Sequence, residues 1–441
     1  MKRGKREQPR PKRHGLRLLA LCPLLVFLTG AAIWGISERN SAGTNPPVSS
    51  AAPSGQQPTA VPTEGQAPVE ETAAVSEPPE PSGTPGPEPS RPAPATLAEQ
   101  TLAGMTLREK VYQMFIVYPS AVTGVRTVTA AGEATRKALE QYPVGGFLYD
   151  RTNMVSKEQV RTMLTNTQSY ARIPMILTCD EEGGRVNRLM GTVGTTYIGP
   201  MLSYKDQGTG VAKSNAQTIA QDMVSCGFNT DLAPVADVWS NPQNTVIGDR
   251  AYSDSYQQAA QLIPAAVEGF HAGGVACALK HFPGHGDTSA DSHYGSVYVY
   301  KPLARIRQEE LLSFQAGIDA GADMVMMGHM IISDVDDQPG LFSEKLVTGL
   351  LREEMGFQGV VISDGLQMQA MTDHYSSADI ALRSVKAGVD ILLCPRDLES
   401  AANALIHAVE AGEISEERID ESVLRILTLK ENRGILTKVP Q

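Results

Sequence analysis

The 441-residue chain is long enough for one large domain or two ordinary ones. It carries 38 basic and 49 acidic side chains, and the first 17 residues hold eight of the basic ones and one acid. The rest of the chain therefore has 30 basic and 48 acidic residues, and this acidic body argues against nucleic acid as a partner, because binding phosphates needs a basic face.

The N-terminal segments predict a membrane anchor. The basic arm, residues 1–17, precedes residues 18–36, an uncharged and almost wholly apolar stretch that is about long enough to cross a bilayer as a helix. A cleavable signal peptide is the alternative, but the apolar core is long for one and no clean Ala-x-Ala site follows it. Since positive charge favours the cytoplasmic side, we expect a single-pass signal anchor with the rest of the chain outside the cell; cleavage would instead give a secreted protein.

Residues 37–95 consist largely of Pro, Ser, Thr, Gly and Glu, with hardly a large apolar side chain. Such a segment cannot bury enough surface to offset the entropy lost on ordering. We therefore expect a disordered linker, kept fairly extended by its prolines.

The cysteines are scattered singly and form no Cys-x-x-Cys pair, which excludes zinc-ribbon and dithiol redox motifs. We expect buried free thiols in the globular part. The five are Cys22, Cys179, Cys226, Cys277 and Cys394.

Residues 96–438 alternate short apolar runs with longer amphipathic stretches, the pattern of repeated βα units around a parallel sheet. Helical patterns such as residues 156–172, 210–227 and 256–274 separate the runs, and the last two end in glycine. Eight such units predict an α/β fold with a single (β/α)8 TIM-type barrel; a doubly wound open sheet is the alternative. The predicted strands begin near Phe115, Val144, Pro174, Phe228, Ala276, Met324, Gly359 and Ile391.

Charged residues and histidines follow several of these strands. Because loops after the strands build the active site of a barrel, we expect these side chains to converge on one rim. Any one of them alone would be an ordinary loop residue. They are Asp180, Glu181, Glu182, Asp231, Asp237, Lys280, His281, His329 and Asp364.

Asp364 ends the apolar run in "GVVISDG". It could cap the helix that follows. The alternative is a nucleophile, since an aspartate can attack an anomeric carbon and form a glycosyl-enzyme.

The segment "KHFPGHGDTSADSHY", residues 280–294, concentrates polar side chains. His281, His285 and His293, with two aspartates, supply zinc ligand types, but they lie on a Pro-Gly loop rather than one turn apart on a helix, and no His-Glu-x-x-His occurs. Gly284 and Gly286 instead suggest a mobile loop that can close over a substrate.

Asp291 and His293 lie two residues apart, so in an extended segment both side chains point the same way. A carboxylate placed beside an imidazole can orient it and leave a proton carrier that works near neutral pH. The alternative is a plain surface histidine.

Two further segments, "DEEGGRVNRL" and "NTVIGDRAYS", combine carboxylates and arginines near predicted strand ends. Such side chains can bind sugar hydroxyls, although surface salt bridges would explain any one of them.

Together these segments resemble glycoside hydrolase family 3, in particular its bacterial β-N-acetylglucosaminidase (β-hexosaminidase) branch. The motif Lys-His-Phe-Pro-Gly-His-Gly-x4-Asp-Ser-His is highly specific. The resemblance implies that Asp364 is the nucleophile, His293 the general acid/base and Asp291 its dyad partner. The matching segments are "MTLREKVYQMF", "VGGFLYD", "DEEGGRVNRL", "FNTDLAPVADVWSNPQNTVIGDRAYS", "ALKHFPGHGDTSADSH" and "GFQGVVISDGLQM".

The resemblance also implies a substrate site without a metal or cofactor. Terminal N-acetylglucosamine would be held by Asp180, Arg188, Arg250, Lys280 and His281. Two positions depart from the family pattern: Glu181 stands where glutamine is common, and Gly365 stands where Asp, Ala or Ser is commoner.

The function that the resemblance implies is retaining exo-β-N-acetylglucosaminidase activity on cell-wall-derived or related glycans outside the cell. The alternatives are a family 3 β-glucosidase, a phosphorolytic N-acetylglucosaminidase, a metal-dependent hydrolase and a non-catalytic cell-wall-binding surface protein. The oligomeric state is not indicated.

Overall fold

The computed structural model of the chain describes residues 95–288 and 295–440. The basic arm, the predicted anchor and nearly all of the linker lie outside these residues, and so do Asp291 and His293. Within the described part, no helix combines the length and the apolar character that crossing a membrane requires. The anchor predicted at residues 18–36 stays a prediction.

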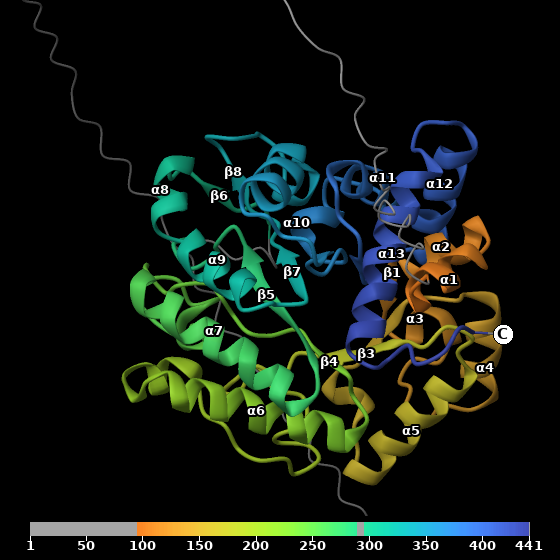
Figure 1. The fold of residues 1–441 in the computed structure, drawn as a ribbon, viewed down its shortest axis with the longest axis horizontal. Helices are drawn as coiled ribbons and strands as arrows, with labels where there is room; N and C mark the ends of the chain where they lie inside the picture. Colours follow the sequence, from red (N-terminus) through yellow and green to blue (C-terminus); the bar gives the residue numbers. More distant parts are fainter. Residues whose placement is uncertain (1–94, 289–294, 441) are drawn as a thin grey trace, which may run out of the picture. The chain divides into compact units, whose positions relative to one another are not determined.

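Eight parallel strands form a nearly closed barrel (Figure 1). Their order in the sheet is β10-β1-β2-β3-β4-β5-β7-β9, and a parallel bridge between Ile362 and Ile391 joins the two end strands. The barrel prediction is thus confirmed for all eight strands, and the open-sheet alternative is wrong. The strands are β1 Phe115–Val117, β2 Gly146–Leu148, β3 Ile176–Cys179, β4 Thr230–Asp231, β5 Ala276–Phe282, β7 Met324–Met327, β9 Val360–Ser363 and β10 Leu392–Leu393.

Helices surround the barrel, and the three helical patterns predicted from sequence are present as α5, α6 and α7. Ser156 begins α5 by accepting a hydrogen bond from the N–H of Gln159, while Gly227 and Gly274 end α6 and α7 in the left-handed conformation. The longer helices are α4 Glu133–Gln141, α5 Lys157–Tyr170, α6 Thr209–Cys226, α7 Tyr256–Gly273, α9 Leu311–Asp319, a π-type helix Lys345–Glu354, α11 Ser377–Ala387, α12 Leu398–Glu410 and α13 Glu416–Asn432.

Shorter elements fill the connections. The short α-helices are α1 Leu97–Ala103, α2 Leu107–Gln113, α3 Ser120–Thr123, α8 Leu303–Gln308 and α10 Gln369–Thr372. The 3-10 turns are Arg151–Asn153, Met201–Gln207, Gly248–Arg250 and Gly340–Phe342. Two short strands that were not predicted, β6 Tyr298–Val299 and β8 Ile331–Ile332, pair in parallel outside the barrel.

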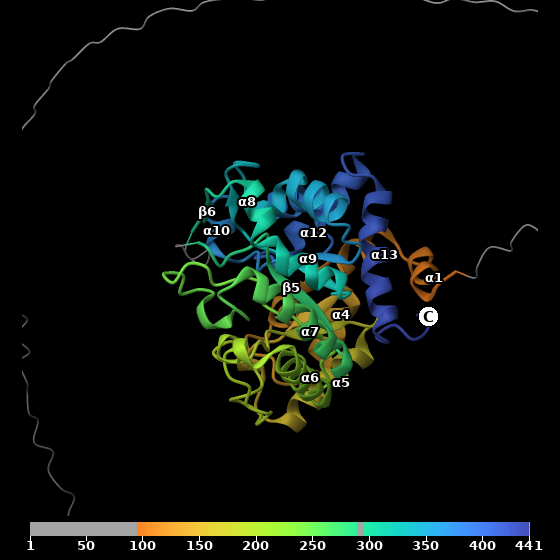
Figure 2. The same cartoon turned by 60° about the vertical axis from the view of Figure 1, so that its left-hand side comes forward.

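Glycines allow α6 and α7 to lie in close contact, side by side in both views (Figures 1 and 2). A Cβ atom at Gly269 would lie 2.3 Å from the carbonyl oxygen of Lys213, and one at Gly273 would lie 2.3 Å from Cβ of Ala220. Glycine is required at these two positions of α7 because there is no room for a side chain, and not because the backbone conformation demands it.

The four cysteines of the described part are buried free thiols, as predicted. Cys22 lies outside the described residues.

Candidate active site

A cavity of about 250 Å³ opens at the carboxyl ends of the barrel strands. It brings together six of the eight predicted site residues, while Asp291 and His293 lie outside the described residues. The six are Asp180, Arg188, Arg250, Lys280, His281 and Asp364. Other lining residues include Tyr118, Glu182, His285, Met326, Gln367 and Met368.

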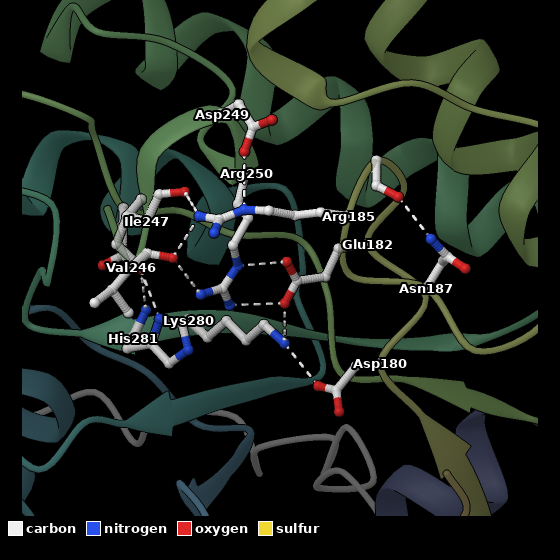
Figure 3. A network of polar contacts seen from close by, with 12 residues as sticks. Asp180, Glu182, Arg185, Asn187, Val246, Ile247, Asp249, Arg250, Lys280 and His281 are labelled. Atoms are coloured by element: carbon white, nitrogen blue, oxygen red, sulfur yellow. Dashed lines mark hydrogen bonds and ion pairs between the residues drawn. The ribbon is translucent and has the colours of Figure 1, made fainter. Parts of the chain in front are cut away.

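Lys280 links two carboxylates at one side of the cavity (Figure 3). Its Nζ lies 2.8 Å from Oδ1 of Asp180 and 2.6 Å from Oε1 of Glu182. Glu182 also faces Arg250, whose Nε and Nη2 donate to its two oxygens at 2.8 and 2.9 Å. The four side chains, which we call the ionic chain, come from the ends of β3 and β5 and from the turn Gly248–Arg250.

The members of the ionic chain compensate one another's burial. Burial alone would raise the pKa of Glu182, but the charges of Arg250 and Lys280 outweigh it and hold that pKa well below the usual range. Burial alone would lower the pKa of Lys280, but the charges of Asp180 and Glu182 outweigh it and raise that pKa. These two groups therefore stay charged at neutral pH, in a form that can donate to and accept from hydroxyl groups.

Arg188 extends this charged surface. Its Nε lies 3.0 Å from Oδ1 of Asp150, and its Nη2 lies 3.3 Å from Oδ2 of Asp180. Asp180 is thus held from both sides, by Lys280 and by Arg188, while its side chain keeps 23% of its surface exposed. It can present a carboxylate edge to a ligand.

Glu181 serves the loop rather than the cavity. Its carboxylate accepts the backbone N–H groups of Arg188, Leu189 and Met190 at 2.5, 2.8 and 3.2 Å. Burial raises its pKa. Glu181, one of the two departures from the family pattern, therefore stabilises the turn that carries Arg188 and does not line the cavity.

Asp237 orients the two histidines of the loop after β5. Its Oδ2 accepts from Nδ1 of His281 at 2.6 Å, and its Oδ1 accepts the backbone N–H of His285 at 2.6 Å. Burial would raise the pKa of Asp237, but the charge and hydrogen bond of His281, with a smaller contribution from His285, lower it overall. The hydrogen bond to Asp237 occupies Nδ1 of His281, so that Nε2 of the same ring is the atom that can contact a ligand. The peptide bond between Lys280 and His281 is cis.

Asp364 follows β9 and lines the cavity. Its backbone N–H donates to the carbonyl oxygen of Met327 at 2.9 Å, and its Oδ1 accepts the N–H of Gly365 at 2.7 Å. Burial would raise its pKa, but the charges of His329 and then His281, with the Gly365 hydrogen bond, lower that pKa to about 2. The carboxylate is therefore ionised at neutral pH.

Asp364 does not cap the next helix. Helix α10 begins at Gln369, its N-cap position is Met368, and no side chain caps it. The alternative interpretation of Asp364 as a capping residue is therefore wrong.

The sequence placed Glu182 and Asp237 among the side chains expected at the rim, but it assigned neither of them a role in the site. Glu182 pairs with both Arg250 and Lys280 in the ionic chain, and Asp237 forms a hydrogen bond with the ring of His281. The signal in the sequence was their position directly after buried strands. It did not tell which of the consecutive acids Asp180, Glu181 and Glu182 would face the cavity.

A cluster of metal-ligand types lies at the opposite ends of the strands. Atoms of His271, Cys277 and Asp323 fall within 4.8 Å of one another, which no other group of three among the described residues does. Arg433 donates to Oδ1 of Asp323 at 2.6 Å, and its Nη2 lies 2.7 Å from Nε2 of His271. A guanidinium already supplies the positive charge there, so the cluster fits a structural ion pair better than a metal centre.

Comparison with known proteins matches residues 106–429 to the family described as "Glycosyl hydrolase family 3 N terminal domain". The β-hexosaminidase A of Pseudoalteromonas piscicida is 34% identical over 334 residues, which make up 69% of this chain and 55% of that protein, so the chain spans about half of that relative's length. A β-hexosaminidase of Xanthomonas oryzae pv. oryzae is 34% identical over 265 residues, covering 58% of this chain and 78% of that one. The structure of a glycoside hydrolase family 3 β-N-acetylglucosaminidase from Paenibacillus sp. str. FPU-7 superposes with a TM-score of 0.71 at 35% identity, covering 75% of this chain and 63% of that one.

Proposed function

Because the chain belongs to glycosyl hydrolase family 3, we propose that it is a retaining exo-β-N-acetylglucosaminidase, a β-N-acetylhexosaminidase that removes terminal non-reducing N-acetylglucosamine. The observation that carries the proposal is that ionised Asp364 shares one small cavity with the ionic chain. The names of the relatives, β-hexosaminidase and β-N-acetylglucosaminidase, support the choice of sugar.

In this proposal Asp364 is the nucleophile. Its carboxylate attacks the anomeric carbon as the bond to the glycosidic oxygen breaks, which forms a covalent glycosyl-aspartate. Water then attacks the same carbon and releases the carboxylate. An aspartate with a pKa of about 2 suits this role, because it needs no deprotonation before it attacks.

His293 is proposed as the general acid/base, with Asp291 as its dyad partner. Protonated His293 donates a proton to the leaving oxygen in the first step, and neutral His293 accepts a proton from water in the second. The support is the Asp-Ser-His spacing and the family resemblance, because both residues lie outside the described part of the chain.

The remaining cavity residues are proposed to hold the sugar. Asp180 and Lys280 can accept from and donate to neighbouring hydroxyls, while His281 offers its Nε2 atom. Arg188 and Arg250 provide further donors at the cavity wall. Charged groups fixed in this way recognise a polar ring without a metal or cofactor.

We further propose that the enzyme works outside the cell on cell-wall-derived or related glycans, tethered by residues 18–36. The support is the apolar stretch and the Pro-rich segment after it. Membrane fractionation of cells that express the intact chain, followed by alkaline extraction, tests the tether: recovery only in the medium of a protein shortened at its N-terminus would show that the segment is cleaved.

The test of the activity is trapping with a 2-fluoro or 5-fluoro glycoside, followed by peptide mapping. We expect the label on the peptide that contains Asp364. Labelling of another peptide, or hydrolysis with inversion at the anomeric carbon, would overturn the mechanism.

Side-by-side assays separate the rivals. An aryl glucoside cleaved faster than an aryl N-acetylglucosaminide would favour a β-glucosidase, and a sugar 1-phosphate formed in phosphate buffer would favour phosphorolysis. Activity lost to a chelator and restored by a metal would favour a metal-dependent hydrolase. No turnover of any glycoside, with retained binding to cell walls, would favour a binding protein.

A further inference from the structure

Two tyrosines on β6 and directly after it expose their rings side by side. The side chains of Tyr298 and Tyr300 are 50% and 78% exposed, whereas Val299 between them is buried. Their ring centroids are 6.1 Å apart and their planes differ by 12°. This is the alternation of an extended strand, which places both rings on its outer face.

This pair is unusual for the surface of the described part. Only six large hydrophobic side chains are exposed there, and the remaining four, Val125, Val155, Tyr197 and Val224, lie elsewhere along the chain. A pair of exposed, stacked aromatic rings is a candidate binding surface, because exposed apolar residues are ordinary singly but marked where they gather. We call Tyr298 and Tyr300 the tyrosine pair.

The tyrosine pair is connected through β8 to the segment beside Asp364. Strand β6 pairs with β8 through the N–H of Ile331, which donates to the carbonyl oxygen of Val297 at 2.8 Å. Strand β8 begins two residues after His329, whose Nε2 lies 3.0 Å from the carbonyl oxygen of Gly365, the neighbour of Asp364. Figure 1 shows β6 beside β8 and near α8.

The size of the cavity requires the rest of a glycan to lie outside it. At about 250 Å³ it falls below the range of about 300–1,000 Å³ that is usual for pockets of drug-sized ligands. It therefore suits one sugar residue, and an exo-acting enzyme must leave the rest of its substrate on the surface around the mouth.

We propose that the tyrosine pair is a stacking platform for a pyranose ring of the glycan, at least two residues beyond the sugar that is released. A pyranose has apolar C–H faces and a polar edge, and a tyrosine ring matches it with an apolar face and a hydroxyl at its edge. Because the strand fixes both rings nearly parallel, little side-chain freedom is lost on binding. This inference rests on the proposed function, since it takes the occupant to be a glycan.

The test compares ligands of different length on the intact chain with the Asp364→Asn substitution, which allows binding without turnover. The probes are β-1,4-linked N-acetylglucosamine oligomers of two and six units, measured by calorimetry. We expect Tyr298→Ala/Tyr300→Ala to weaken binding of the six-unit oligomer about three- to tenfold, and to leave the two-unit oligomer unchanged. Tyr298→Phe/Tyr300→Phe should keep most of the affinity, because the ring faces carry the contact.

Tyr197→Ala is the matched control, since Tyr197 is 75% exposed and has no ring partner among the described residues. Tyr300→Ala alone serves if the double variant does not fold. An unchanged affinity of the alanine variant for the long oligomer would overturn the platform, and so would an equal loss in the phenylalanine variant. A change in sedimentation with full glycan affinity would identify a protein contact instead.

The proposed function has a separate readout. If the unmodified chain does not hydrolyse an aryl N-acetylglucosaminide, the proposed activity fails, whereas the binding measurements still decide whether the tyrosine pair holds a glycan.

Discussion

Glu182 and Arg250 form a two-pronged ion pair inside the candidate active site, with N–O distances of 2.8 and 2.9 Å. Glu182 is almost fully buried, and it is the only carboxylate of the described residues that contacts both Arg250 and Lys280. It therefore controls how two cations of the cavity are placed.

Glu182→Ala should lower the free energy of unfolding by about 3–5 kcal/mol, because buried Arg250 loses its carboxylate partner and Lys280 keeps only Asp180. It should also raise KM for an aryl N-acetylglucosaminide, since Arg250 and Lys280 lose their fixed positions. Urea unfolding and steady-state kinetics check both effects. Glu268→Ala, which removes an exposed ion pair with Lys213, is the control and should change neither. Equal stabilities of the two variants would contradict this role for Glu182.

Asp237→Asn should impair binding through His281. Asp237 accepts N–H groups from His281 and His285, and an asparagine would turn a donor toward at least one of them. We expect a loss of about 1–3 kcal/mol in stability and a higher KM. Asp319→Asn, at an exposed position of α9, is the control. A KM that matches this control would show that Asp237 does not position the sugar site.

The acid limb of the pH profile should lie far below neutral pH. Because the pKa of Asp364 is about 2, kcat/KM should not fall on the acid side until the pH approaches 3, provided that the protein stays folded. On the alkaline side it should fall as His293 loses the proton that it donates to the leaving oxygen. The profile is therefore expected to be flat between a far-acid limb and the alkaline limb.

His329→Asn tests the cause of this behaviour. The charge of His329 is the largest influence that lowers the pKa of Asp364 against burial, so its removal should move the acid limb of kcat/KM to higher pH. His374→Asn, on an exposed turn after α10, should leave the limb in place. Identical acid limbs in both variants would mean that another group holds Asp364 ionised.

The barrel could be predicted from the sequence because its strands are buried on both faces. Strands such as β7 and β9 read as continuous apolar runs, and the glycines after α6 and α7 mark the ends of their helices. Strands β6 and β8 could not be predicted in this way, because each is two residues long and their pairing depends on loops that meet only in the folded chain.

The site was predictable to the extent that strand ends converge. Asp364, Lys280 and Asp180 were placed correctly by that rule. The different roles of Glu181 and Glu182 were not, because the turn after β3 sends one carboxylate to backbone N–H groups and the other to Arg250. Such a choice is made by tertiary contacts that no local pattern contains.

Gly286 sets a close approach between two loops of the site. A Cβ atom there would lie 1.8 Å from the carbonyl oxygen of Val238, which belongs to the backbone and cannot rotate away. Gly286→Ala should therefore displace the loop after β5 and lower kcat/KM at least tenfold. It should also reduce the thermal unfolding midpoint, by about 2–4 °C for each kcal/mol lost from the free energy of unfolding. Gly132→Ala, where nothing lies within 4 Å, is the control. Normal activity of the Gly286 variant would show that this contact can relax.

Buried Lys430, on helix α13, makes the free energy of unfolding depend on pH. It lies fully buried on α13, its Nζ donates to Oε1 of Gln113 at 2.7 Å, and burial lowers its pKa to about 7. In the unfolded chain the same lysine would have a pKa of about 10.4. Between pH 7 and pH 10.4 the unfolded chain therefore binds more protons than the folded chain. The free energy of unfolding rises with pH in this window, by at most about 1.4 kcal/mol per pH unit. Lys430→Met should remove this rise, whereas Lys438→Met, at an exposed position, should keep it. Urea unfolding at pH 6, 8 and 9.5 measures the slope, and a rise that persists in Lys430→Met would assign it to another group.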